Sequence, residues 1–262
     1  MNLVMIGAAV WVASGSDHPG RVLAIAVFVA GFLQLAFTEP FTLNRADQFR
    51  PQPPPPMASQ QYVREYNEVK AAGKSTAHAP PNANTEVARF WSVNFVAQWN
   101  EAARGMAISE DLDTGKSARL FALLNLAAAD AAIATWDSKF HYNFWRPSTA
   151  IPEGAADGNP RTDGDAAWLP LIADPPYPDY VSGANGLTGA FTGMLQDFFG
   201  TDEMNFSVRT TSPFVLDNVR DYTHFSQAAQ EVVDARIYLG IHFRSADEDG
   251  RRLGDRVAHW TY

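Results

Sequence analysis

The chain of 262 residues contains no cysteine. Disulfide bonds, thiolate metal sites and cysteine nucleophiles are therefore excluded, because each of them needs a thiol. The absence of cysteine also removes the usual sign of an oxidising or reducing environment. The composition consequently leaves open whether the protein is exported or cytoplasmic.

Positive charge is scarce as well. The chain has 20 Lys and Arg residues against 29 Asp and Glu residues, a formal net charge of −9 and a sequence pI near 5.1. A nucleic-acid partner is not expected, because its phosphates require clustered basic surface. Any anion site must be a local concentration of cations inside an acidic protein. The 46% share of hydrophobic residues indicates a globular chain with one sizeable core.

Internal repeats and sustained period-two alternation between hairpin turns are also missing from the sequence. Apolar residues recur at helical spacing instead, so we predict an all-α protein. The stretch Thr114–Phe140 is apolar on most sides and is expected to form a central, buried helix. Residues 151–181, rich in Pro, Gly and Asp, predict a long ordered loop, which in a compact domain tends to be functional. Further helices are predicted at Ser59–Gly73, from Thr85 to Ala103, at Gly183–Phe199, at His224–Phe243 and at Glu248–Trp260.

The amino-terminal part differs in character from the rest. The run Val22–Phe37 has 16 residues of which only Gln34 is polar; a membrane-spanning helix needs about 20. A core or interfacial segment and a membrane anchor both stay open for residues 22–37, which no secretory cleavage site follows. Residues 50–56, Arg-Pro-Gln-Pro-Pro-Pro-Pro, predict an extended connector. We therefore expect an atypical segment with its connector, residues 1–57, and a helical domain, residues 58–262.

Three short segments carry residues suited to binding an anion. The first, Lys139-Phe-His-Tyr-Asn-Phe-Trp-Arg146-Pro147, separates two cations by seven positions. If it is helical, Lys139 and Arg146 lie on one side, roughly 10.5 Å apart along the axis. Two snorkelling cations on a surface helix are the simpler interpretation. The aromatic residues between them indicate a more buried setting.

The second segment, Pro178–Gly186, places Ser182 and Gly183 at the expected start of an apolar helix. A serine hydroxyl and the free N–H groups of a first turn form an anion seat, and the helix dipole favours negative charge there. Gly183 lets the backbone approach a ligand closely. An ordinary serine N-cap is the alternative interpretation.

In the third segment, Arg236-Ile-Tyr-Leu-Gly-Ile-His242, six positions separate a cation from an imidazole. On a regular helix their side chains lie about 120° apart, so only the long arginine reaches toward the histidine. A histidine among apolar neighbours is more often a hydrogen-bonded core residue than a ligand. The carboxylates of Asp247, Glu248 and Asp249 follow closely and are candidates to orient the imidazole.

Taken together and in this order, the three segments resemble the signature of the phosphatidic acid phosphatase type 2 and vanadium haloperoxidase superfamily. The residues at 129–133, 142–147, 175–180 and 240–243 look like those of bacterial vanadium-dependent haloperoxidase homologues rather than membrane lipid phosphatases. The resemblance extends from about Glu39 to Val257, and residues 1–37 mostly fall outside it. It implies a helical bundle of the haloperoxidase and acid phosphatase type.

The resemblance also implies a role for each matching position, with vanadate as cofactor and phosphate able to occupy the same site. Lys139, Arg146 and Arg236 would neutralise the equatorial oxygens. Ser182 and the Gly183 N–H would donate hydrogen bonds to the same oxygens. His242 would be the axial ligand to vanadium, or the nucleophile in a phosphatase. The remaining pocket residues by this analogy are Trp136, Tyr177, Ala184 and Asn185.

One position departs from the family pattern. Its second motif ordinarily ends Ser-Gly-His, and the histidine is the acid/base group, whereas this chain has Ala184 followed by Asn185. Alanine cannot transfer a proton, and loss of a positioned general acid/base costs ~10²–10⁴-fold in rate. Asn185 could hydrogen-bond a peroxide or hydroxide oxygen without shuttling protons. The conceivable substitutes are Asp179, His141 and His224.

The function implied by the resemblance is that of a peroxidase, a vanadate-dependent haloperoxidase using hydrogen peroxide to oxidise halide, with a small organic substrate and an activity impaired at Ala184. One alternative is an acid-phosphatase-like phosphoester hydrolase in which His242 attacks phosphorus. The other is a degenerate homologue that binds an oxyanion or a hydrophobic molecule, or that catalyses a cofactor-free rearrangement. A bacterial source is implied, and a homo-oligomer stays open.

Overall fold

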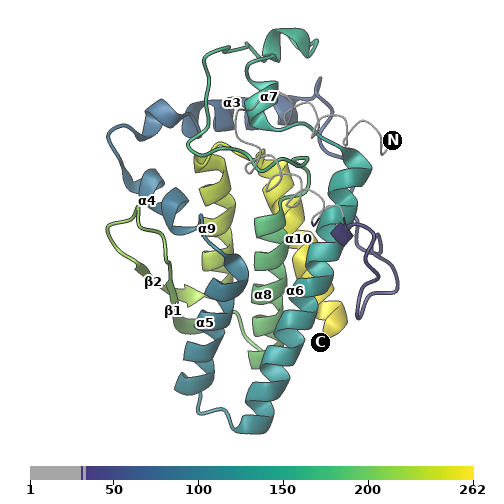
Figure 1. The fold of residues 1–262 in the computed structure, drawn as a ribbon, viewed down its shortest axis with the longest axis vertical. Helices are drawn as coiled ribbons and strands as arrows, with labels where there is room; N and C mark the ends of the chain where they lie inside the picture. The colour runs from purple at the N-terminus through teal and green to yellow at the C-terminus, as the bar shows by residue number, and fades with distance from the viewer. Residues whose placement is uncertain (1–30, 32–33) are drawn as a thin grey trace, which may run out of the picture.

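The computed structural model describes residue 31 and residues 34–262, and within them the all-α prediction is confirmed: long helices stand side by side as a bundle (Figure 1). Most of the run 22–37 lies outside the described residues, as does Met1–Ala13. Short 3₁₀ turns at Ser75–His78 and Gly154–Ala156 accompany the helices. The α-helices are α3 Gln60–Ala72, α4 Ala83–Phe90, α5 Phe95–Ser109, α6 Thr114–Tyr142, α7 Pro147–Ala150, α8 Gly183–Phe199, α9 Phe225–Tyr238 and α10 Arg244–Thr261.

Polar side chains define where the helices begin. The hydroxyl of Ser59 accepts a hydrogen bond from the Tyr62 N–H, and Asp113 accepts one from the Lys116 N–H. These contacts satisfy N–H groups that the first turn of a helix leaves without a partner. Gly73 ends α3, as the sequence predicts. The same kind of cap is made by Asn82 for α4, Asn94 for α5 and Ser182 for α8.

Glycines allow α8 and α10 to pack backbone against backbone. A Cβ added at Gly254 of α10 would collide with the carbonyl oxygen of Gly186, and one added at Gly189 would collide with that of Arg251. A Cβ at Gly250 would stand 2.7 Å from the Ser182 carbonyl oxygen. The close approach therefore places the start of α10 directly beside the start of α8.

We expect Gly254→Ala to lower the free energy of unfolding by about 1–3 kcal/mol, because the added methyl group must push two backbones apart. Gly105→Ala is the matched control, since nothing lies within 4 Å of a Cβ at this position in α5. In the control, alanine should stabilise the helix by about 0.5–1 kcal/mol. Chemical denaturation measures both changes, and equal stability of the two variants would contradict this account of the interface.

The helix α6 is partly, not wholly, a central helix. Its carboxyl-terminal half is buried on most sides, whereas Ala122 and Asn125 of the other half are exposed. The stretch Thr114–Ala150 is long and apolar enough to cross a membrane. It contains an 18-residue window with a mean hydropathy of 1.4, and half of this window is buried inside the protein. The burial is what a core helix of a folded domain requires.

One helix ends two residues later than predicted, and another ends earlier. The helix α6 stops at Tyr142 because Asn143 adopts a left-handed conformation with φ 47°. The helix α9 stops at Tyr238, and Gly240 takes a positive φ of 78° before α10 begins. A single predicted helix from Thr85 to Ala103 is also wrong, since residues 91–94 separate α4 from α5.

A hairpin that the sequence did not indicate covers one side of the bundle. The strands β1 (Glu203–Arg209) and β2 (Val219–His224) pair antiparallel. Phe206 of β1 packs against Trp99, with ring centroids 6.3 Å apart. The two strands are short and bury few side chains, so their alternation of apolar and polar residues is too brief to predict a hairpin from the sequence.

Residues 41–50, in the amino-terminal segment ahead of residue 58, lie against α6. The carboxylate of Asp130 accepts hydrogen bonds from the backbone N–H groups of residues 41–43 at 2.7–3.1 Å. Arg50 makes a two-point ion pair with Asp137 at 2.8 Å. The two aspartates thus hold the amino-terminal segment to α6, whereas the domain division at residue 57 stays a prediction.

Candidate functional site

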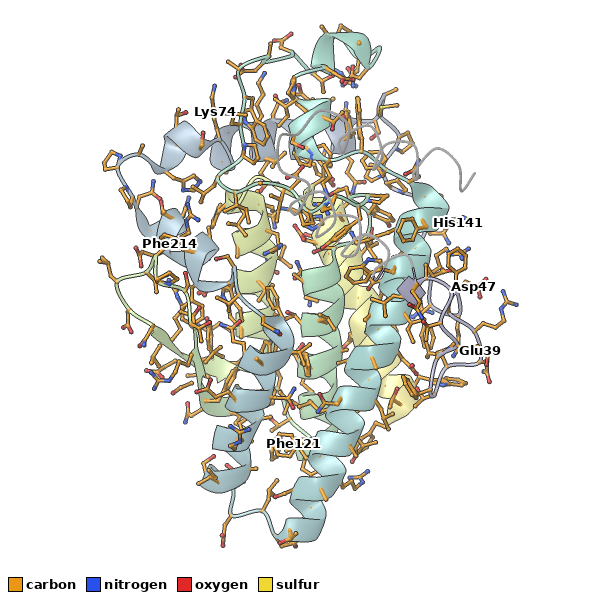
Figure 2. All side chains as sticks on the ribbon, in the orientation of Figure 1. Glu39, Asp47, Lys74, Phe121, His141 and Phe214 are labelled. Atoms are coloured by element: carbon orange, nitrogen blue, oxygen red, sulfur yellow. The ribbon has the colours of Figure 1, made fainter. Side chains whose placement is uncertain are left out.

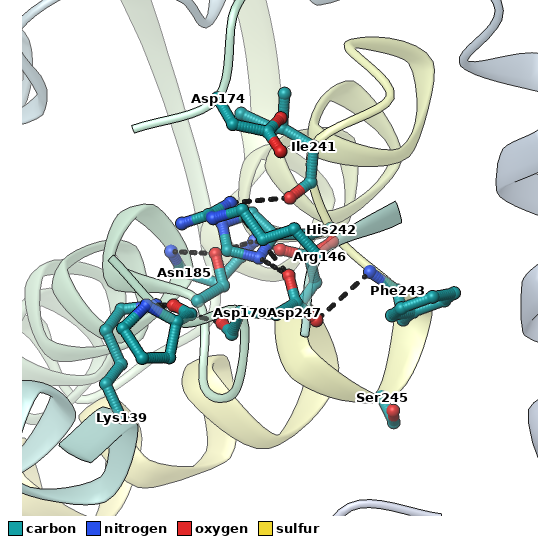
Figure 3. A network of polar contacts seen from close by, with 12 residues as sticks. Lys139, Arg146, Asp174, Asp179, Asn185, Ile241, His242, Phe243, Ser245 and Asp247 are labelled. Atoms are coloured by element: carbon teal, nitrogen blue, oxygen red, sulfur yellow. Dashed lines mark hydrogen bonds and ion pairs between the residues drawn. The ribbon is translucent and has the colours of Figure 1, made fainter. Parts of the chain in front are cut away.

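The three anion-binding segments meet at one end of the bundle. The end of α6, the loop after it, the first turn of α8 and the junction of α9 with α10 converge there (Figure 1). Figure 3 shows Lys139, Arg146, Asn185 and His242 in a network of polar contacts with Asp174, Asp179 and Asp247. Residues more than 100 positions apart in the sequence are therefore brought to one place by the tertiary structure.

Lys139 is fully buried. Its Nζ donates hydrogen bonds to the carbonyl oxygens of Pro178 and Asp179 at 2.8 and 2.9 Å, and it lies 5.1 Å from the ring centroid of Tyr177. Burial, followed by the neighbouring Arg146, holds the pKa of Lys139 well below its ordinary value. A bound anion would favour the charged ammonium.

Arg146 reaches the site from the N-cap of α7, not from the helix that carries Lys139. The shared helical face expected for these two cations is therefore wrong, although they do converge. Arg146 donates from Nε to the Tyr177 carbonyl at 2.8 Å and from Nη1 to the Ile241 carbonyl at 2.6 Å. Its Nη2 is buried without a hydrogen-bond partner among the described residues.

His242 lies in the segment between α9 and α10, with 2% of its surface exposed. Its Nδ1 is 2.6 Å from Oδ1 of Asp179. Burial and the charges of Arg146, Lys139 and Arg236 hold the pKa of His242 well below its ordinary value. The imidazole is therefore neutral; with the proton on Nδ1 toward Asp179, the lone pair of Nε2 is left available to a ligand.

Asp179, and not one of Asp247, Glu248 or Asp249, orients the imidazole. The sequence offered Asp179 only as a substitute acid/base group. Burial raises the pKa of its carboxyl, while Arg146 and Lys139 oppose the shift. The contact with Nδ1 makes Asp179 a positioning residue in this structure.

Arg236 extends from α9 toward the same point. Its Nη1 donates to the Trp91 carbonyl at 3.2 Å, and its Nε is buried without a hydrogen-bond partner among the described residues. It borders a pocket of about 270 Å³. The predicted pocket residues Trp136, Tyr177 and Ala184 line the pocket as well, together with Gly183, which was predicted to bind the anion.

Ser182 is the N-cap of α8, and its hydroxyl accepts from the Asn185 N–H at 3.4 Å. A Cβ at Gly183 would stand 2.7 Å from the Trp136 ring, so no larger residue fits there unless the indole moves. Asn185 does not line the pocket, contrary to expectation. Its side chain is fully buried and donates to Oδ1 of Asp247 at 2.8 Å, because it points toward α10.

Asp247, predicted only as a candidate to orient the imidazole, takes a different position in the structure. It is fully buried on the first turn of α10, and its Oδ2 has no hydrogen-bond partner among the described residues. Burial raises its pKa well above the ordinary value, opposed by the Ser182 hydroxyl, Arg236 and Asn185. Asp247 is the fourth residue of α10, and it is buried where α10 packs against α8.

We expect Asp247→Asn to be more stable than the wild type near neutral pH, because burial disfavours the charged carboxylate of Asp247. The folded pKa of Asp247 exceeds its unfolded value, so the wild type loses stability as the pH rises through that interval, whereas asparagine does not titrate. The difference in melting temperature should therefore grow as the pH rises from about 4.

Asp165→Asn provides a control of opposite sign. Its hydrogen bond with Lys74 lowers the pKa of Asp165, so this contribution is present above the unfolded pKa and lost as the pH falls. The stability deficit of this variant should shrink toward low pH. A difference for Asp247→Asn that did not change with pH would show that the carboxyl does not titrate as its burial requires.

The two histidines considered as substitutes for the missing acid/base group lie elsewhere. His141 is exposed on the last turn of α6 and stacks edge-on against Tyr142 (Figure 2). His224 is exposed at the end of β2, where Nδ1 is 2.9 Å from the Thr223 hydroxyl. Neither histidine belongs to the network of polar contacts around His242 among the described residues.

The donor set fits an oxyanion better than a bare metal ion. Among the described residues, no group of three or more His, Cys, Asp and Glu side chains could hold a cation. The site offers one neutral imidazole and three buried cations, and two N–H donors, at Arg146 and Arg236, are buried without a partner in the described part of the chain. This combination matches a tetrahedral anion such as vanadate or phosphate, whose oxygens need donors and positive charge.

Comparison with known proteins agrees with the geometry. A family model for the VCPO second helical-bundle domain matches residues 119–262. The vanadium chloroperoxidase of Curvularia inaequalis is 29% identical over 216 residues, which are 66% of this chain and 34% of that protein. The chain therefore spans about a third of the length of this curated relative.

Solved structures show the same fold. A bacterial vanadium-dependent iodoperoxidase matches with a TM-score of 0.74 and 30% identity, covering 87% of this chain and 56% of that one. The apo form of a bacterial vanadium-dependent chloroperoxidase matches with a TM-score of 0.69 and 16% identity, covering 87% and 54%. The matched helical-bundle domain makes up more than half of the chain. The chain therefore belongs to the vanadium haloperoxidase family.

Proposed function

We propose that this protein binds vanadate and acts as a vanadium-dependent haloperoxidase whose halide oxidation is slowed by the alanine at position 184. The observation that carries the proposal is a neutral, buried imidazole, fixed by a carboxylate, beside three buried cations. When bound, vanadate would supply the Lewis-acidic centre that activates hydrogen peroxide toward halide.

Each residue has a distinct task in this proposal. His242 would offer Nε2 as the ligand while Asp179 holds its Nδ1, which fixes the orientation of the ring. Arg146 and Arg236 would donate their unpartnered N–H groups to the oxygens of the anion. Lys139 would add positive charge to the same site. Burial strengthens all of these interactions, because water does not screen them.

Two openings border the cationic residues. Tyr177 lines both the pocket of about 270 Å³ that contains Ala184 and a hollow of about 500 Å³ on the side of Arg146. The smaller pocket contains Arg236 and suits hydrogen peroxide and a halide. The larger one contains Phe144, Trp145 and several prolines, and suits a small organic substrate.

The proton-transfer step is where this chain departs from its family. Ala184 borders the pocket and offers no group that gives or takes a proton. Solvent or peroxide itself must then exchange protons. We therefore expect vanadate binding to be retained and turnover to be low, with iodide, the most easily oxidised of these halides, as the best substrate.

The test is to titrate the purified protein with vanadate and then follow oxidation of iodide and bromide by hydrogen peroxide. Activity should appear only with vanadate, and p-nitrophenyl phosphate should not be hydrolysed at a comparable rate. Vanadate binding with phosphatase turnover and no halide oxidation would favour the hydrolase instead. Absence of any vanadate binding would refute the proposal.

A further inference from the structure

Asp247 is a buried carboxyl among groups suited to bind an anion, and no step above uses it. It interacts electrostatically with Arg236 of α9, Lys139 of α6 and Asp179 of the loop before α8. Figure 3 shows it within the same network as Asp179, Asn185 and His242. A carboxylate beside an anion seat repels the anion unless a hydrogen bond connects them.

The unpartnered atoms of the site are of two kinds. Among the described residues, Nη2 of Arg146 and Nε of Arg236 can only donate. Oδ2 of Asp247 and Oδ1 of Asp174 are acceptors when ionised, and Oδ1 of Asn185 is always an acceptor. A ligand that satisfies both kinds must present several acceptor oxygens and at least one O–H. Leaving a buried polar group of either kind unpaired weakens binding.

A tetrahedral oxyanion that keeps a proton at neutral and mildly alkaline pH meets this requirement. Hydrogen phosphate and hydrogen vanadate carry such an O–H group, whereas sulfate has only acceptor oxygens. A carboxylate and an oxyanion can form a hydrogen bond only if one of them carries a proton, and sulfate carries none. It must therefore bind with Asp247 protonated, at the expense of a proton taken from solution.

From this arrangement we infer that Asp247 accepts a hydrogen bond from the protonated oxygen of the bound oxyanion and thereby selects hydrogen phosphate and hydrogen vanadate against sulfate. The inference deepens the proposed function, because it rests on the same anion seat. It assigns the discrimination to a residue of α10, which the three sequence segments do not include.

The surroundings of Asp247 support this role. Asn185 donates to Oδ1 at 2.8 Å and so fixes the carboxyl group, while Oδ2 is buried without a hydrogen-bond partner in the part of the chain that the structure describes. The high pKa that burial gives to Asp247 means that its oxygen holds a shared proton well. Its charged and polar neighbours are Lys139, Asp179, Ser182, Asn185 and Arg236.

The test compares phosphate and sulfate binding by calorimetry at about pH 8, where only phosphate keeps its proton. Wild-type protein should bind phosphate on the order of 10- to 100-fold more tightly than sulfate, as loss of a charged hydrogen bond implies. In Asp247→Asn the amide can donate to sulfate or accept from phosphate, so the preference should fall to a few-fold at most.

Asp165→Asn is the matched control, because this carboxyl is paired with Lys74 at 2.7 Å and has no contact with the anion seat among the described residues. The phosphate preference should persist in this variant. An Asp247→Asn protein that keeps the wild-type preference, with its helical circular dichroism intact, would overturn the inference while leaving the anion seat in place. Equal binding of phosphate and sulfate by the wild type would do the same.

Should Asp247→Asn fail to fold, proton uptake by the wild type decides the matter. Sulfate binding, measured in buffers of different ionisation enthalpy, should take up more protons than phosphate binding. Equal uptake for both anions would overturn the inference. Failure of the wild type to bind vanadate or phosphate at all would instead refute the proposed function, and this inference with it.

Discussion

Replacing Ala184 with histidine is expected to raise the vanadate-dependent rate of halide oxidation by about 10²–10⁴-fold, the range for a positioned general acid/base group. Ala184 is only half-buried and borders the pocket that also contains Arg236, so a larger side chain has room to extend into it. Steady-state rates with iodide and bromide, at saturating vanadate, measure the gain. The affinity for vanadate should change far less than the rate.

Ala184→Gln is the control for this gain, since glutamine fills similar space and hydrogen-bonds but does not transfer protons. It should remain close to the wild-type rate. A histidine variant that binds vanadate and is no faster than the glutamine variant would show that the missing imidazole is not what limits this protein. The effect of the histidine should also vanish at low pH, when the imidazole starts protonated.

Replacing His242 with alanine is expected to weaken vanadate binding by more than ~100-fold, the most that loss of a supporting partner of a metal ligand usually costs. The imidazole is the one neutral nitrogen ligand in a network otherwise made of cations, amides and carboxyls. Vanadium-51 NMR or calorimetry with the purified variant measures the loss. Phosphate, which needs no nitrogen ligand, should lose much less affinity than vanadate.

His141→Ala supplies the comparison, because His141 is exposed and lies outside the network. Its vanadate affinity should match the wild type. His242→Gln guards against a trivial loss of folding, since glutamine can still donate to Asp179 without offering a ring nitrogen. Wild-type vanadate affinity in either His242 variant would refute its assignment as the ligand.

The helical class and most helix positions could be predicted from the sequence, because the spacing of apolar residues along a helix is visible within a short stretch of sequence. The apolar spacing of Thr114–Phe140 and the cap at Ser59 correspond closely to α6 and α3. Prediction failed at helix ends, at the break between α4 and α5, and at the β1–β2 hairpin. Asn143 and the glycine at 240 adopt left-handed conformations, and these breaks release Arg146 and His242 from the helices expected to carry them.

The candidate site was predictable in its membership but not in its geometry. Lys139, Arg146, Ser182, Arg236 and His242 were recognised by their order and spacing. Asp179 and Asp247 were seen but given other roles, since which carboxylate meets the imidazole depends on how the loop before α8 packs. Hydrogen bonds across 60 or more positions, such as 179 to 242 and 185 to 247, leave no periodic signal.

The sequence by itself determined a helical bundle, the absence of thiol chemistry, and a set of cations, a serine and an imidazole in a recognisable order. Only the tertiary structure decided that Asp179 holds His242, that Asn185 turns away from the pocket, and that Asp247 is buried beside the anion seat. The reason is physical. Composition and helical periodicity act over a few residues, whereas the protonation of a buried group depends on neighbours that only folding brings together.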